Sequence, residues 1–136
     1  MKITTQNLAQ LPYSLHDMSV IGFELHENEL TLQLDGLVKI ASPCEQVKGS
    51  VRFCGIDWDF CWVYVLNFIG NEGTFTGEKM TLRHFMEQWS KMRFDIIDET
   101  YSWHKARLGG WLSVGDTLKE CVLEISYDRK MEYIEY

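Results

Sequence analysis

Residues 49–70, which read GSVRFCGIDWDFCWVYVLNFIG, form the most apolar and aromatic stretch of the chain. In an extended strand that starts at Trp58, both faces are apolar, because aromatic residues alternate with cysteine, valine and isoleucine. A strand of this kind is typical of the centre of a sheet, where it is covered above and below. The stretch is too long for one strand, so we expect a tight turn at residues 55–57 that folds it into a hairpin.

Two shorter strands are predicted before this hairpin. Apolar residues alternate over 21–25 and again over 30–34, and the polar connector 26–29 has the length of a hairpin loop. Each of these strands has one apolar and one polar face. We therefore expect the pair to cover the core from one side.

One helix is predicted after residue 80. An apolar stripe at i, i+3, i+4 and i+7 is formed by Leu82, Phe85, Met86 and Trp89. Thr81 suits the N-cap, so we expect the helix at about residues 81–91. Strand-like alternation returns after it, and we expect a turn at residues 127–130. The alternating glutamates of residues 131–136, which follow that turn, suit a solvated edge strand.

These elements predict an α+β fold, with a mostly antiparallel, strongly bent sheet or partial sandwich and one principal helix. The length of 136 residues suits a single domain over residues 1–136. The sequence starts without an apolar segment suited to a signal peptide, and no apolar run reaches the roughly 20 residues that span a bilayer. We therefore expect a cytoplasmic protein without a membrane partner.

The net charge of the chain indicates which class of macromolecule it could bind. The formal net charge is −7, and lysine and arginine are scattered along the chain, so a surface that follows nucleic-acid phosphates is not expected. An acidic surface favours a basic protein partner, although many proteins are acidic for solubility alone.

Metal and redox motifs are absent from the sequence. The four cysteines form no C-x-x-C pair, and we expect Cys54, Cys61 and Cys121 to be buried thiols and Cys44 to lie in a loop. The four histidines are dispersed and lack the spacing of metal ligands. We expect no metal, no cofactor and no catalytic residues, because nucleophile elbows, phosphate-binding loops and dinucleotide fingerprints are also missing.

Residues 103–111, WHKARLGGW, are the first candidate site. Tryptophan and arginine are frequent anchors of protein interfaces, so the predicted binding residues are Trp103, His104, Arg107 and Trp111. Packing within an ordinary hairpin explains the same pattern equally well, and both interpretations stay open.

A second candidate site combines two acidic clusters. A carboxylate beside an imidazole can orient a general base, and paired carboxylates beside an aromatic ring resemble a sugar or cation site. This alternative pocket would contain His16, Asp17, Asp57 and Asp59. Turn formation is the competing explanation, because aspartate and histidine often bond to nearby backbone groups there.

The sequence Leu15-His16-Asp17-Met18-Ser19-Val20, followed by an amphipathic hairpin, resembles the start of small bacterial domains that are uncharacterised or belong to the toxin-immunity proteins. The resemblance covers residues 15–35, and Met18 stands where serine is expected. It implies an acidic α+β protein that acts by binding, with no catalytic residues.

The function expected from the sequence is non-catalytic protein binding, of toxin-immunity type where the resemblance holds. The alternative is a small-ligand or enzymatic site in the concave face of the sheet. A homodimer through the C-terminal edge strand is a further expectation.

Overall fold

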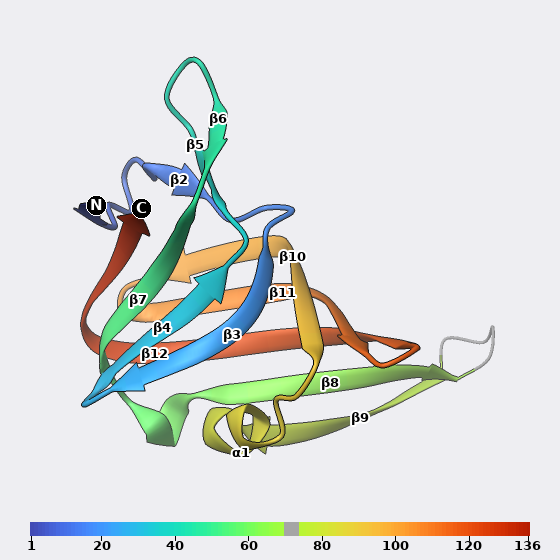
Figure 1. The fold of residues 1–136 in the computed structure, drawn as a ribbon. Helices are drawn as coiled ribbons and strands as arrows, with labels where there is room; N and C mark the ends of the chain where they lie inside the picture. The colour runs from blue at the N-terminus through green and yellow to red at the C-terminus, as the bar shows by residue number, and fades with distance from the viewer. Residues whose placement is uncertain (70–73) are drawn as a thin grey trace.

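The computed structural model describes residues 1–69 and 74–136, and most of the chain forms strands (Figure 1). Strands account for 67% of the residues and helices for 7%. The predicted α+β class is therefore wrong, and the protein is nearly all β. The elements, in chain order, are β1 (Lys2–Thr5), β2 (Tyr13–Ser14), β3 (Ser19–His26), β4 (Glu29–Leu34), β5 (Leu37–Lys39), β6 (Glu45–Val47), β7 (Gly49–Ile56), the 3₁₀ turn η1 (Trp58–Phe60), β8 (Trp62–Ile69), β9 (Thr74–Thr81), α1 (Leu82–Glu87), β10 (Met92–Ser102), β11 (Lys105–Val114) and β12 (Thr117–Glu135).

Six strands close into a barrel in place of the predicted bent sheet or sandwich. Their order is β3-β4-β7-β12-β11-β10, and β10 pairs with β3 again. This closing pair is short, with Phe94 opposite Val20 and Asp95 opposite Ser19. The backbone of Ile96 extends the seam through hydrogen bonds with the backbones of Asp17 and Met18. Closure gives every barrel strand a neighbour on both sides.

Apolar side chains fill the inside of the barrel. Alternate residues of each strand point inward, as the pattern over 30–34 indicated. The pattern over 21–25 was misleading, because Ile21 and Leu25 are exposed and Val20 is the buried residue, next to a register shift between Val20 and Gly22. A six-stranded barrel is narrow, so these side chains meet across its axis. The fully buried ones include Leu30, Leu32, Val51, Phe53, Phe94, Ile96, Leu108, Leu123 and Tyr133.

The longest strand, β12, is the element around which the chain is arranged. Its first half lies between β11 and β8, and its second half lies between β7 and β1. A register irregularity between Tyr127 and Lys130 replaces the turn that the sequence indicated there. The prediction that residues 131–136 form an edge strand is wrong, because residues 132–135 pair with β7 on one side and β1 on the other.

The predicted hairpin at residues 55–57 is also absent: over the described residues 49–69, β7 and β8 do not pair with each other. They lie end to end along β12, with Ile56 opposite Tyr127 and Trp62 opposite Glu124. η1 fills the gap between them, so Trp58 belongs to a turn and not to a strand. The pattern that is apolar on both faces predicted the strand β8 correctly, but it did not indicate which strand pairs with it.

β8 and β9 extend the sheet beyond the barrel, and α1 follows them directly (Figure 1). Thr81 is the N-cap of α1, as predicted, and its hydroxyl accepts a hydrogen bond from the His84 amide. The helix ends at Glu87, well before residue 91. Trp89 still packs at right angles to Phe23, with ring centroids 5.0 Å apart, after the helix has ended. A left-handed Lys91, with φ of 52°, then turns the chain into β10.

A smaller sheet of three strands, β2-β5-β6, lies outside the barrel. Within residues 1–69 and 74–136, none of the helical segments has the length and apolar character needed to cross a bilayer.

Candidate functional site

The outward side chains of β10, β11, β12, β8 and β9 form one continuous surface, which we call the five-stranded face. These strands lie side by side in Figure 1. In β10, β11, β12 and β8, most of the residues that alternate with the outward ones are buried on the opposite side. The pairing registers place the outward side chains in three cross-strand rows. These rows are Thr100-Arg107-Glu124-Trp62-Thr81, Asp98-Gly109-Val122-Tyr64-Lys79 and Asp95-Trp111-Glu120-Leu66-Gly77.

The opposite outer face, over β3, β4 and β7, has a different character. Its central row pairs Thr31 with Arg52 and Arg52 with Glu132, and the guanidinium contacts the Glu132 carboxylate at 2.8 and 2.9 Å. The Cys54 thiol donates to the same carboxylate at 3.3 Å. Burial alone would raise the pKa of Glu132, but these hydrogen bonds and the nearby positive charges hold it below its usual value. The polar groups of this face therefore satisfy one another.

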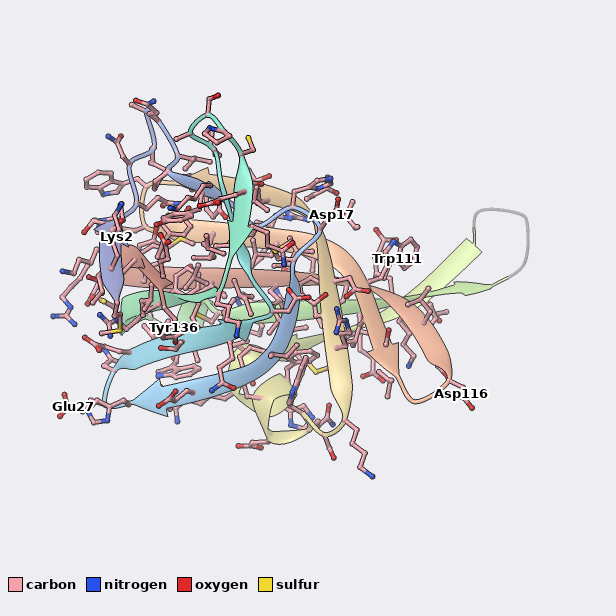
Figure 2. All side chains as sticks on the ribbon, turned by 45° about the horizontal axis from the view of Figure 1, so that its top comes forward. Lys2, Asp17, Glu27, Trp111, Asp116 and Tyr136 are labelled. Carbon is pink, nitrogen blue, oxygen red and sulfur yellow. The ribbon has the colours of Figure 1, made fainter. Side chains whose placement is uncertain are left out.

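The two faces lie on different sides of the molecule. Figure 2 shows Trp111, which belongs to the five-stranded face, far from Glu27 at the tip of the β3–β4 hairpin. A partner that covers one face would therefore leave the other in water.

A depression of about 650 Å³ lies on the five-stranded face above Gly109. We call it the glycine depression, because Gly109 has no side chain in the middle of its row while its neighbours do. Its outward lining is formed by Ile97, Asp98, Thr100, Arg107, Trp111, Glu120 and Val122.

A second depression of about 450 Å³ lies on the same face beside η1. We call it the aromatic depression, since Phe60, Trp62 and Tyr64 line it. The Lys79 ammonium lies 4.2 Å from the centre of the Trp62 ring and 5.7 Å from that of Tyr64, so a cation–π contact already covers part of the aromatic surface.

Glu124 lies between the two depressions. Its carboxylate is 3.5 Å from the Arg107 guanidinium and 3.9 Å from the Lys105 ammonium, and only 12% of its side chain is exposed. One acid thus holds two bases in place. The middle of the face is charged but locally neutralised.

Three stacked rings stand where β10 turns into β11. Trp103 stacks on His104 at 4.7 Å between centroids, and His104 stacks on Tyr127 at 5.9 Å. His104 has a φ of 62°, a left-handed conformation that is uncommon outside glycine. Tyr127 is buried, so the stack is fixed to the core at one end, while Trp103 is 81% exposed at the other. An exposed indole therefore stands at the outer end of a stack that begins in the core.

Comparisons with protein-family models, with curated proteins and with solved structures each give no match.

All four predicted binding residues lie on the five-stranded face or at its end. Arg107 and Trp111 line the glycine depression together, whereas Trp103 and His104 belong to the ring stack. Trp111 lies six positions along β11 from Lys105 at the turn, which is roughly 20 Å, whereas Arg107 lies only two positions, or roughly 7 Å, from it. The structure places them on one surface but in two clusters.

The four residues of the alternative pocket are not brought together. His16 Nδ1 contacts the Ile97 carbonyl oxygen at 2.6 Å, and its Nε2 lies 3.5 Å from the Asp17 carboxylate. Asp57 lines the aromatic depression, and its amide donates to the Ser126 carbonyl.

Their separation follows from the pairing of the strands. Ser126 is opposite Lys105, and Lys105 is opposite Ser102, which is five residues along β10 from Ile97. Five residues of strand span roughly 17 Å, before the distance across two further strands is added. Asp59 is exposed on η1. In the described residues, no three His, Cys, Asp or Glu side chains are grouped as metal ligands would be.

The concave face of the sheet is where the alternative function would place its site. It forms the inside of the barrel, and the core side chains described above occupy it. The two depressions on the five-stranded face open outward.

Sequence reasoning missed several residues of this face. Trp62 and Tyr64 were assigned to a doubly covered strand, although both are half-buried and face outward. Gly109 pairs with Asp98 and Val122, next to a register irregularity between Ile96 and Asp98. The alternation of Lys105, Arg107, Gly109 and Trp111 was the available signal, because it predicts an outward row with a missing side chain.

Proposed function

We propose that this protein is a non-catalytic binding protein that recognises another protein through its five-stranded face. The observation that carries the proposal is the ring stack, which holds Trp103 81% exposed at the end of that face. Ordering a flexible side chain opposes binding, so an aromatic side chain that is already fixed is a favourable anchor.

The rest of the face has the composition of an interface. Trp62, Tyr64 and Trp111 provide large side chains, and Glu124 with its two bases provides fixed charges between them. Aromatic residues and arginine are enriched at protein interfaces, and charges that are already paired cost less to cover.

The proposal includes a class of partner and a location. The resemblance of residues 15–35 to toxin-immunity domains favours a toxin as the partner. The motif itself has a structural role, because Leu15 is fully buried and its carbonyl accepts a hydrogen bond from the Met18 amide. Four free cysteines suit a cytoplasmic protein.

A homodimer remains a competing proposal, but not through residues 131–136. Among the described strands of the larger sheet, β9 pairs on one side only, with β8, and so offers an unpaired backbone edge. Sedimentation of the purified protein distinguishes a homodimer from a protein that binds only a different partner.

The test is affinity capture from an extract of the host cells with matched variants. Trp103→Ala removes the exposed anchor, and the control Glu24→Ala removes an exposed side chain of the opposite face. Both variants should keep the circular dichroism spectrum of the parent protein. We expect one protein to be captured by the parent and by Glu24→Ala, with at least tenfold less on Trp103→Ala, as for a typical anchor residue. Equal capture by both variants would overturn the proposal.

A further inference from the structure

We infer that the glycine depression is the receptacle for one arginine side chain of a basic partner protein. This inference rests on the proposed function, since it names what the five-stranded face recognises. It goes beyond the ring stack because it concerns a different part of the face and a specific chemistry.

The shape of the depression follows from Gly109. Its neighbours in the row are Asp98 and Val122, and its neighbours along the strand are Arg107 and Trp111. All four have side chains that rise from the sheet while Gly109 has none. The result is a recess with a backbone floor in the middle of an otherwise covered surface.

The recess has room for a further side chain. A Cβ atom built on Gly109 would meet Asp98 and Val122 at 3.8 to 3.9 Å, which is ordinary van der Waals contact. The neighbouring Gly110 is different, because a Cβ there would overlap the Asp95 carbonyl oxygen. Gly110 is needed for the strands to approach, whereas Gly109 leaves a space that the fold does not require.

The charges in the recess favour a cation. Asp98 and Glu120 line it, and neither carboxylate has a hydrogen-bond or ion-pair partner among residues 1–69 and 74–136. Arg107, which also lines it, is already paired with Glu124. A positively charged side chain that enters the recess would therefore meet two carboxylates that lack a partner.

Arginine fits this lining better than lysine does. Its planar guanidinium can bond to a carboxylate through two parallel hydrogen bonds and can also lie against an aromatic ring. The recess offers both, because Trp111 lines it together with Asp98 and Glu120. The net charge of −7 would also attract a basic partner toward this surface.

The experiment titrates ¹⁵N-labelled protein with N-acetyl-arginine amide at low salt and follows the backbone amide signals. We expect saturable shifts at Gly109 and Val122, and none with the citrulline analogue, which has the same shape without the charge. Asp98→Asn should weaken binding about tenfold, as the loss of one charge-assisted hydrogen bond commonly does.

Gly109→Val is the decisive variant, because it fills the recess while a β-branched residue suits a strand. Ser113→Val, on the same outward side of β11 but beyond the recess, is its matched control. Arginine binding should disappear in the first variant and persist in the second. Unchanged binding in a folded Gly109→Val protein, or equal binding of citrulline, would overturn the inference.

Failure of this inference can be distinguished from failure of the proposed function. If Trp103→Ala loses the captured partner while Gly109→Val retains it, the face binds a protein but the arginine receptacle is wrong. If the arginine compound binds at Gly109 and no variant changes capture, the receptacle is supported and the proposed function is wrong.

Discussion

Gly55 shows how one residue fixes the end of a strand. It has a φ of 77°, and its amide and that of Ile56 both donate to the Asn28 carbonyl, which joins β7 to the β3–β4 turn. A Cβ at this position would overlap the carboxylate of Asp128. The glycine indicated a tight turn at this position, as predicted, but the turn does not belong to a β7–β8 hairpin.

We predict that Gly55→Ala lowers the free energy of unfolding by about 2 kcal/mol, from left-handed backbone strain together with displacement of the exposed Asp128 side chain. Urea denaturation measures this loss. The control is Gly115→Ala, where φ is 59° but nothing lies within 4 Å of the added Cβ. It should cost only about 1 kcal/mol of left-handed strain. Equal losses in the two variants would show that the overlap is not real.

Glu99 is a half-buried acid that contacts the segment before β3. Its carboxylate accepts hydrogen bonds from the Leu15 amide at 2.5 Å and from the Ser14 hydroxyl at 3.4 Å. Burial raises the pKa of Glu99, and these hydrogen bonds only partly oppose that effect. The folded state therefore disfavours the ionised form of Glu99 relative to the unfolded chain.

A raised pKa in the folded state means that this contribution to stability is fully present below the unfolded pKa and is lost as the pH rises through the folded value. We predict that Glu99→Gln, which keeps an oxygen acceptor, stabilises the protein at pH 7 and gains nothing near pH 4. Thermal denaturation at both pH values tests this prediction. A variant that is less stable than the parent at pH 7 would contradict it.

Residue-level placement was predictable where burial alone decides it. Cys54, Cys61 and Cys121 are buried and Cys44 is exposed, as their patterns indicated. The outward direction of Trp62 was not predictable, because an apolar residue in a strand is consistent with either face until the neighbouring strands are known.

At the level of elements, β12 combines two strands that the sequence separated at residues 127–130. The charged residues there suggested a turn, but the structure accommodates them with a register irregularity. Alternation fixes which residues share a face, whereas it does not specify which strands pair. That is why the β3–β4 hairpin was predicted correctly and the β7–β8 hairpin was not.

We predict that hydrogen exchange is slowest in the middle of β12, over residues 121–125, because β11 and β8 cover both of its edges. Alternate amides of residues 76–81 in β9 should exchange orders of magnitude faster, since they point away from β8. Mass spectrometry or NMR after transfer to D₂O measures both. Fast exchange over residues 121–125 would mean that β12 is not the stable centre of the fold.

At the level of the whole molecule, the barrel depends on a seam that no local pattern encodes. β10 and β3 meet over only two residue pairs, and they are far apart in the sequence. Closure results from the twist of six strands and from the register of each pair. The sequence therefore predicted many of the strands but placed them in an open sheet.

β12 belongs both to the barrel and to the extension formed by β8 and β9, so we predict that the two parts unfold together. Far-ultraviolet circular dichroism reports the strands, and near-ultraviolet signals report tryptophans in both parts, including Trp62 in β8 and Trp89 after α1. The two urea transitions should coincide. A separate early transition in the near-ultraviolet signal would show that the extension unfolds alone.

The ring stack at the end of the five-stranded face also has an optical consequence. Trp103 is 81% exposed, so its indole emits as a water-surrounded fluorophore, yet the stack on His104 keeps it from moving freely. A molecule that covers the indole would shift its emission toward the blue, and subtraction of the Trp103→Phe spectrum would isolate that signal. The protein thus contains its own fluorescent reporter for whatever comes to rest on this end of the face.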